Sequence, residues 1–161
     1  MNSPTTGTDP ETLVRRWFEE LFNRADPSVA DEILAETVAY HGPPSLSPGD
    51  VTGPEEIKEY VEVYKTAFPD LVYAVEELSA TDGEVRVRWS ATGTQESDLF
   101  GMDPTGEMFS AEGISVFVVE GGEITEVYAQ WDTLQMVQDL GVVPPVGLAA
   151  DSSTDERDEE S

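Results

Sequence analysis

The stretch that decides the fold of this chain is EMFSAEGISVFVVEGGEITEVYAQWD, residues 107–132. It contains two runs rich in β-branched and aromatic residues, and the pair Gly121-Gly122 separates them. Two glycines between two such runs are typical of a tight hairpin, because glycine readily adopts the positive φ angles that the turn requires. The stretch therefore predicts a long antiparallel hairpin whose second strand runs from Ile124 to Trp131.

The second strand of this hairpin also carries polar residues at every other position. Successive side chains of a strand point to opposite faces. On that spacing one face is expected to hold Ile124, Glu126, Tyr128, Gln130 and Asp132. Polar side chains on an otherwise apolar surface indicate a lined cavity, since a solid core would leave them unsatisfied.

The chain before the hairpin shows helical periodicity first and strand periodicity afterwards. The predicted helices begin at Pro10, Asp26 and Pro54. A short strand is expected to end at His41, and two further strands flank the turn at 81–83. Residues 133–140 predict a short C-terminal helix. This order predicts an α+β fold, with three N-terminal helices packed on a curved, mixed or antiparallel sheet.

Length and composition bound the class of protein. A chain of 161 residues is expected to form one domain, here over 9–145, with a flexible N-terminus at 1–8 and a disordered acidic tail at 146–161. Cysteine is absent, which excludes disulfides and thiolate ligands. We find no run of about 18 apolar residues and no basic amphipathic leader, so we expect a cytoplasmic protein that does not bind membranes.

The charge is the most unusual bulk property. Thirty-four acidic against eight basic residues give a formal net charge of −26. Such a surface repels a phosphate backbone, which excludes nucleic acid as a partner. Hydrophobic residues nevertheless make up 39% of the chain and follow periodic patterns, which predicts folding. We interpret the charge as that of a halophile's cytoplasmic protein, from a halophilic archaeon, in which molar salt screens self-repulsion.

Several short segments, spread along the chain, resemble those of a known family and occur in the same order. They are VRRWFEE (14–20), AFPDL (67–71), VRW (87–89), GT (93–94), FG (100–101), PTG (104–106) and QWD (130–132). With them the chain resembles the SnoaL-like polyketide cyclases, or ester cyclases, of the NTF2-like superfamily over roughly residues 11–145. The resemblance implies a cone-shaped α+β fold with a pocket for a small hydrophobic molecule, and chemistry without metal or organic cofactor.

The activity implied by the resemblance is an intramolecular aldol condensation that closes a ring in a polyketide ester. The same cone also hosts isomerases, dehydratases, epoxide hydrolases and pure binding domains, so the fold alone does not give the reaction. The alternatives to a cyclase or related lyase or isomerase are therefore a non-catalytic ligand-binding domain and an interaction module. The interaction module would use the outer face of the sheet, where exposed residues such as Val116 or Val118 predict a homodimer.

Asp132 is the first catalytic candidate. In the family that the chain resembles, an aspartate near this point acts as general acid/base, and an aldol closure needs one proton removed from carbon and one delivered to oxygen. The neighbouring Tyr128 and Trp131 would supply apolar surroundings. The alternative is structural, because the sequence from Asp132 to Gln135 also matches a helix N-cap with glutamine at the reciprocal position.

Four further polar residues are candidates for the site. His41, the single histidine, has a reference pKa near neutrality and would relay a proton or orient a carbonyl, or it is an ordinary strand-end residue. Gln95 stands where many relatives carry histidine; it can orient a substrate but cannot shuttle protons, and it is otherwise a loop residue. Glu112 is either a second pocket acid or solvent-facing. Gln130 shares the face of Asp132 and is a candidate for hydrogen bonding to a substrate.

Aromatic residues complete the predicted site. Those that suit a flat, apolar ligand, and that helix or strand spacing also explains as core, are Trp17, Tyr60, Tyr64, Phe68, Trp89 and Phe117. Among them we expect Trp17, Tyr64 and Trp89 to contact the substrate, together with Tyr128. No local pattern predicts a metal or nucleotide site.

The halophilic interpretation makes a testable prediction. We expect the thermal unfolding midpoint to rise as KCl increases from low to molar concentration, because salt screens the repulsion within a chain of net charge −26. Circular dichroism melts at both concentrations measure this. A midpoint that does not respond to KCl contradicts the interpretation.

Overall fold

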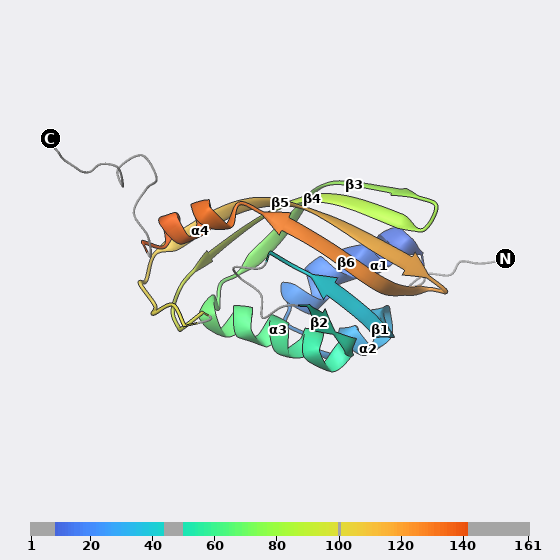
Figure 1. Ribbon diagram of the computed structural model, residues 1–161, viewed down its shortest axis with the longest axis horizontal. Coiled ribbons are helices and arrows are strands. Elements are labelled where there is room, and N and C mark those ends of the chain that lie inside the picture. The colour runs from blue at the N-terminus through green and yellow to red at the C-terminus, as the bar shows by residue number, and fades with distance from the viewer. Residues whose placement is uncertain (1–8, 44–49, 100, 142–161) are drawn as a thin grey trace, which may run out of the picture.

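The computed structural model describes residues 9–43, 50–99 and 101–141, and it places the helices against a six-stranded mixed sheet (Figure 1). The elements in chain order are α1 (Pro10–Arg16), a π-helical segment η1 (Trp17–Phe22), α2 (Ser28–Ile33), β1 (Leu34–His41), β2 (Val51–Thr52), α3 (Gly53–Ala67), β3 (Val72–Thr81), β4 (Glu84–Thr94), β5 (Met108–Glu120), β6 (Glu123–Trp131) and α4 (Thr133–Asp139). The predicted α+β fold is confirmed. The predictions for segments 1–8 and 146–161 lie outside the described residues.

The first helix forms as the sequence predicts. The carboxylate of Asp9 accepts a hydrogen bond from the backbone N–H of Thr12 at 3.3 Å, and Pro10 occupies the first helical turn, where its missing N–H is not needed. Its apolar stripe is fully buried, and it continues through Trp17 and Phe18 into the wider π-helical turn of η1. The helix is thereby anchored along its whole length by apolar burial.

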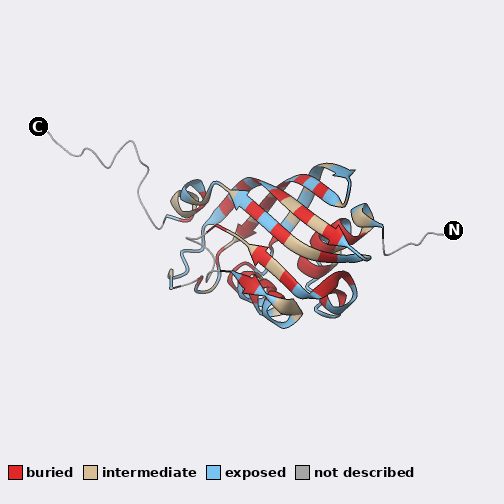
Figure 2. Ribbon diagram, turned by 45° about the vertical axis from the view of Figure 1, so that its right-hand side comes forward, coloured by how far each residue is buried: buried red, intermediate tan, exposed pale blue. Residues whose placement is uncertain are grey.

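The sheet has the strand order β2-β1-β6-β5-β4-β3. All neighbouring strands are antiparallel except β1 and β6, which pair in parallel. Strand β1 follows α2 without a loop and begins at Leu34, earlier than the short strand that was predicted to end at His41. Figure 2 shows buried and exposed residues alternating along the strands, so that one face packs on the helices and the other faces solvent.

One extra residue in β6 overturns the predicted arrangement of faces in this strand. Val118 pairs with Glu126 while the next residue of β5, Val119, pairs with Ile124, so Thr125 has no partner of its own and forms a β-bulge. Ile124 therefore points into the core, whereas Glu126, Tyr128 and Gln130 point outward despite their even spacing from it. The prediction that these polar residues line a cavity is wrong, because the bulge reverses the alternation.

Trp89 packs across the middle of the hairpin on the inner face of the sheet. Its indole lies over Gly113 of β5, where an added Cβ would come within 2.2 Å of the ring. The indole N–H donates a hydrogen bond to the hydroxyl of Ser115 at 2.9 Å, which satisfies both buried polar groups. The absence of a side chain at Gly113 thus makes room for the largest residue of this face.

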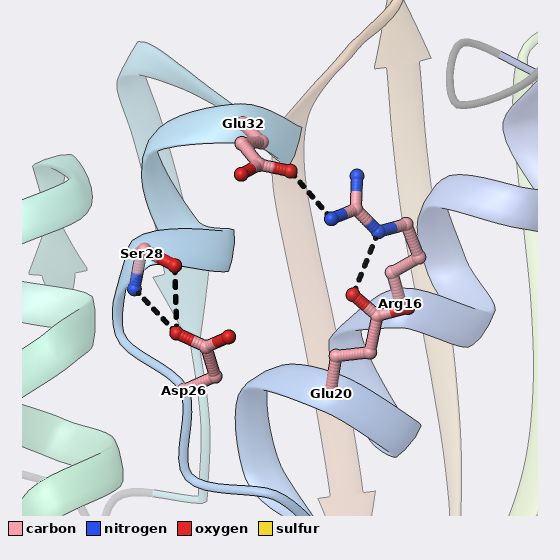
Figure 3. A network of polar contacts seen from close by, with 5 residues as sticks. All are labelled: Arg16, Glu20, Asp26, Ser28 and Glu32. Atoms are coloured by element: carbon pink, nitrogen blue, oxygen red, sulfur yellow. Dashed lines mark hydrogen bonds and ion pairs between the residues drawn. The ribbon is translucent and has the colours of Figure 1, made fainter.

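Ion pairs at Arg16 connect the first helix to α2 (Figure 3). Its guanidinium donates to Glu20 within the same helical run at 3.0 Å and to Glu32 of α2. The hydrogen bond to Glu32, with the other contacts, raises the pKa of Arg16 against the effect of its partial burial. At the start of α2, Asp26 accepts hydrogen bonds from the N–H and hydroxyl of Ser28. This network holds the two helices together at the surface and belongs to the scaffold.

Among the described residues, no helix is long and apolar enough to cross a membrane.

We predict that Gly113→Ala destabilises the protein by about 1–3 kcal/mol, because the new methyl group overlaps the rigid, buried indole of Trp89. Ser110→Ala is the matched control, since Ser110 lies on the exposed face of the same strand and its replacement should change stability by no more than about 0.5 kcal/mol. Chemical denaturation of both variants in molar KCl measures the difference. Equal stability of the two variants would contradict the proposed packing.

Candidate functional site

A small apolar cavity lies between the inner face of the sheet and helices α3 and α4. Its volume is about 10 Å³, the space of a single water molecule. The residues that line it are Tyr64, Leu71, Tyr73, Trp89, Ala91, Phe109, Ala111, Trp131 and Met136. None of these lining residues carries a charge. The cavity is therefore the place in the described fold where a small, uncharged apolar molecule would be enclosed, provided that its walls move apart.

Four tyrosine side chains lie at or near this cavity, and two of them, Tyr64 and Tyr73, line it. Tyr40 of β1 and Tyr60 of α3 place their hydroxyl oxygens 3.2 Å apart. Tyr60 also packs on Tyr64, one helical turn further along, with ring centroids 5.1 Å apart, and the two side chains are hydrogen-bonded. Tyr73 of β3 is close enough to influence the ionisation of the other three. We call these four residues the tyrosine cluster.

Burial determines the protonation state of the tyrosine cluster. Loss of hydration raises the pKa of Tyr40, Tyr60 and Tyr64 well above the ordinary value, and their mutual repulsion in the ionised form adds to this. Burial alone raises the pKa of Tyr73 in the same direction. All four phenols are therefore neutral at physiological pH and can donate hydrogen bonds.

Asp132 is next in the chain to a residue of the cavity wall. It follows Trp131, which lines the cavity, and precedes α4, which covers the cavity with Met136. Its side chain is exposed, and one carboxylate oxygen accepts a hydrogen bond from the backbone N–H of Gln135 at 2.9 Å. The predicted N-cap is confirmed, although the Gln135 amide donates to Asp139 rather than back to the cap. A catalytic role for Asp132 stays a prediction.

Gln95 lies away from the cavity and holds a loop together. It is fully buried, and its side-chain amide donates to the carbonyl oxygens of Met102 at 3.1 Å and Ser97 at 3.3 Å. Its amide oxygen accepts from the hydroxyl of Thr105 at 3.5 Å. The side-chain amide thus forms its hydrogen bonds within the loop, and Gln95 is not among the residues that line the cavity.

The other predicted polar site residues lie on the outer face of the sheet. His41, Glu112, Tyr128 and Gln130 all point away from the helices. The bulge at Thr125 explains this for the residues of β6, and the regular alternation of β5 explains it for Glu112, for which the solvent-facing alternative holds. The structure does not bring these side chains together with Asp132 in one cavity.

Three of the predicted aromatic contacts are buried on the inner side, in different places. Tyr64 and Trp89 line the cavity, as expected for substrate contacts. Trp17 instead fills the core beside the cavity, where its ring packs edge-on against Phe117 at 5.4 Å and stacks on Tyr40 at 5.9 Å. The structure therefore supports the first two as wall residues and shows Trp17 as core.

Tyr73 and Met136 are cavity residues that the sequence interpretation left out. Tyr73 has the same two-residue spacing as Leu71 and Val75 and alternates with Val72 and Ala74, so its position on the inner face follows from the spacing. Its hydroxyl on an apolar face was the signal of a polar group inside the core. Met136 could not be found in this way, because nothing local shows that α4 folds back over the sheet.

His41 is the centre of a charged cluster on the outer face. Its Nδ1 lies 3.1 Å from Asp50 and its Nε2 3.3 Å from Glu126, and its ring stacks on Tyr128 with centroids 4.7 Å apart. Partial burial lowers the pKa of His41, but the hydrogen bonds to the two carboxylates outweigh that effect, so the pKa lies above its ordinary value. The protonated imidazole donates to both carboxylates and ties the start of β2 to the sheet.

No group of three or more His, Cys, Asp or Glu residues within the described ranges could hold a metal ion.

We predict a pH dependence of stability that originates at His41. Because its folded pKa exceeds the unfolded value of about 6.5, its contribution is complete below that pH and is lost as pH rises through the folded pKa. His41→Gln should remove this contribution, so that the wild-type and variant unfolding free energies differ most at low pH and approach each other at high pH. Urea denaturation between about pH 5.5 and 8.5 measures it. A difference that grows with pH would contradict the assignment.

Comparisons with known proteins agree on the family. The family model described as SnoaL-like polyketide cyclase matches residues 12–140. One similar solved structure is a candidate SnoaL-like polyketide cyclase from Jannaschia sp. CCS1, with a TM-score of 0.76 and 23% identity over 89% of this chain and 99% of that one. Another is IdmH, a candidate polyketide cyclase from Streptomyces antibioticus, with a TM-score of 0.72 and 26% identity over 83% and 99% of the two chains.

A third similar structure shows that names vary among proteins of this shape. AclR, a candidate hydroxylase from Streptomyces galilaeus, has a TM-score of 0.71 and 21% identity, over 88% of this chain and 87% of its own. A comparison with curated proteins finds no match. The α+β fold and the family match over most of the chain lead to one conclusion: this chain belongs to the SnoaL-like polyketide cyclase family.

Proposed function

We propose that this chain is a cofactor-independent cyclase, or a related lyase or isomerase, that acts on a small hydrophobic carbonyl compound. The observation that supports this most is the succession of Trp131, in the wall of an uncharged apolar cavity, and Asp132, an exposed carboxylate that directly follows it in the chain. One oxygen of Asp132 caps α4, and the other makes no hydrogen bond within the described residues. That second oxygen is available for proton transfer to a ligand whose apolar part lies in the cavity.

The proposed reaction needs only one acid/base group. The carboxylate removes a proton from a carbon that lies between two carbonyl groups, which leaves an enolate. The enolate carbon then forms a bond to the carbon of a third, more distant carbonyl group of the same molecule. The carboxylic acid returns the proton to the alkoxide oxygen that results. Atoms and electrons balance without an oxidant, reductant or co-substrate, so the proposed reaction needs no cofactor.

Access of a ligand to this cavity requires α4 to move. The cavity of about 10 Å³ holds no more than a water-sized group, and Met136 of α4 is buried in its wall. Methionine is flexible and adapts its shape to a neighbour, which makes it suited to a wall that must yield. Helix α4 has seven residues and is held by the Asp132 cap and by a bond from the Ser110 N–H to Asp139. A movement of α4 would have to break these bonds and expose the buried side chains of Met136 and Leu140.

We expect Asp132→Asn to retain the fold and to lose turnover by about 10²–10⁴-fold. Asparagine is as good an N-cap as aspartate, so the substitution removes the acid/base group while it preserves the start of α4. Melting temperatures together with turnover of enolisable keto-esters, screened first with the wild-type protein, measure the two effects. The matched control is Asp103→Asn, an exposed carboxylate outside the cavity wall. Full activity of the Asp132→Asn variant would contradict the acid/base role of Asp132.

A non-catalytic binding domain is the second candidate function. The observation that favours it is Gln95, whose amide cannot shuttle protons and forms its hydrogen bonds within the loop from Ser97 to Thr105. Native mass spectrometry of the purified protein separates the two functions. A tightly retained and chemically unchanged small molecule supports binding alone, whereas conversion of a keto-ester supports catalysis.

We further propose that two copies pair through the outer face of the sheet in a halophile's cytoplasm. Apolar side chains are exposed there, with Ile114 at 60%, and Arg86 and Arg88 make this face less acidic than the chain as a whole. Ile114 and the two arginines border a surface groove of about 580 Å³. Exposed apolar area beside two arginines is what two chains of net charge −26 need in order to associate.

The dimer proposal predicts the effect of an added charge. In molar KCl we expect light scattering to give the mass of a dimer for the wild type and of a monomer for Ile114→Glu, because a buried, unpaired carboxylate opposes association. Val63→Glu on α3 is the control, since Val63, like Ile114, is an exposed β-branched apolar residue but lies outside the sheet. A wild-type monomer in molar KCl would contradict the proposal.

A further inference from the structure

The hydroxyl of Tyr73 is the feature of the tyrosine cluster that the fold leaves unexplained. The ring of Tyr73 packs against Trp89 at 5.1 Å and Phe22 at 5.2 Å, and its backbone is held on both sides by Asn23, whose amide accepts from the Tyr73 N–H at 2.8 Å and donates to its carbonyl oxygen at 3.0 Å. The side chain is therefore firmly positioned. Its hydroxyl, however, makes no hydrogen bond with any residue that the structure describes.

Tyr73 is partly buried, and loss of hydration at its hydroxyl raises its pKa, so a hydroxyl without a partner at this position is unusual. Most buried polar side-chain atoms are hydrogen-bonded, and each exception calls for an unseen water, a ligand or a functional role. The neighbouring phenols show the ordinary behaviour, since Tyr40 and Tyr60 bond to each other at 3.2 Å. Phenylalanine at position 73 would fill the same apolar space without the unpaired hydroxyl. The hydroxyl of Tyr73 is thus available to a group that enters the cavity that it lines.

The other residues of the lining define the chemistry of that group. Trp89 already donates its indole N–H to Ser115, and the remaining surface is apolar. No lysine, arginine or histidine lines the cavity, so a carboxylate or phosphate would be buried without a counter-charge. A neutral, flat molecule with one oxygen that accepts a hydrogen bond fits both the walls and the phenol. A carbonyl, an enol and a phenol share that property.

We propose that the tyrosine cluster, through the hydroxyl of Tyr73, is the subsite that binds the oxygen of an uncharged enolisable carbonyl compound. This rests on the proposed function, because it concerns the same cavity, and it adds the group that recognises the ligand oxygen. Tyr73 donates a hydrogen bond to that oxygen, and Tyr64, on the same cavity wall and hydrogen-bonded to Tyr60, lies beside it. The neutral state of these buried phenols keeps them donors at physiological pH.

The cluster would also favour the enolate over the ketone. Negative charge that develops on the carbonyl oxygen strengthens a hydrogen bond from a phenol in a water-free site. The aldol sequence proposed above passes through such an enolate. Tyr73 would therefore assist the same proton removal for which Asp132 is the proposed base, from the opposite, buried end of the ligand.

The test compares two probes of equal size that differ in one oxygen. Phenol, a stable enol mimic, and toluene are titrated separately into the full chain in molar KCl, and binding is followed by NMR chemical shifts. We expect the wild type to prefer phenol and Tyr73→Phe to reduce the phenol affinity by about tenfold, while the toluene affinity stays within about twofold. Tyr128→Phe is the matched control, because Tyr128 lies on the exposed outer face, and it should change neither affinity.

Stability provides an independent readout. Because Tyr73→Phe removes a hydroxyl without a partner, it should leave the melting temperature of the ligand-free protein unchanged or higher, whereas Tyr60→Phe breaks the bond to Tyr40 and should lower it. Met136→Ala serves as a second background with a larger cavity, for use if the wild-type walls admit neither probe.

The outcomes separate this inference from the proposed function. An unchanged ratio of phenol to toluene affinity in Tyr73→Phe overturns the oxygen subsite, as does a marked loss of stability in that variant, and the cavity proposal survives both. Failure of both probes to bind, in the wild type and in Met136→Ala alike, overturns the binding cavity itself and the subsite with it. Loss of phenol binding alone in Tyr73→Phe supports the subsite even if Asp132→Asn proves fully active.

Discussion

The bulge in β6 is the constraint on which the arrangement of the site depends. A single unpaired residue, Thr125, shifts the register between the two strands of the central hairpin. Behind the bulge, Val127, Ala129 and Trp131 point toward the helices, and the polar residues between them point to solvent. Without the extra residue, Trp131 would face outward and the polar residues would enter the core, where their desolvation would oppose folding.

The inner face that results is filled mainly by aromatic rings. Gly113 provides the space for Trp89, and Trp89 in turn packs edge-on against Trp131 at 5.8 Å and Tyr73 at 5.1 Å. Together with α4 these rings leave only a small, uncharged cavity. Charged side chains are concentrated on the outer surface, where hydration and screening by salt reduce their mutual repulsion. The polar groups retained inside are hydroxyls, amides and indoles, which can be buried neutral.

This separation gives the site its chemical character. The cavity wall carries no charge and includes the phenols of Tyr64 and Tyr73, and the carboxylate of Asp132 follows the wall residue Trp131 in the chain. The carboxylate of Asp132 also caps α4, so one residue both begins the helix that covers the cavity and would act on its contents. Capping and catalysis, which are alternatives for Asp132 when it is considered in isolation, are therefore compatible in this geometry.

The sequence by itself determined the α+β class and the burial of the helix stripes through the spacing of apolar residues. It determined the glycine turn of the hairpin and the Asp9 and Asp132 caps through the residue types at those positions. All of these features depend on neighbours within a few residues. The short segments that resemble the SnoaL-like family indicated the cone. Only the tertiary structure decided which face of β6 is buried, since a bulge depends on the pairing of two strands and leaves no mark in the spacing of either. It also decided that Gln95 serves a loop, that His41 binds Asp50 and Glu126, and that Tyr73 of β3 and Tyr64 of α3 line the same cavity. These contacts join residues far apart in the chain, and their existence follows from how the sheet curves around the helices.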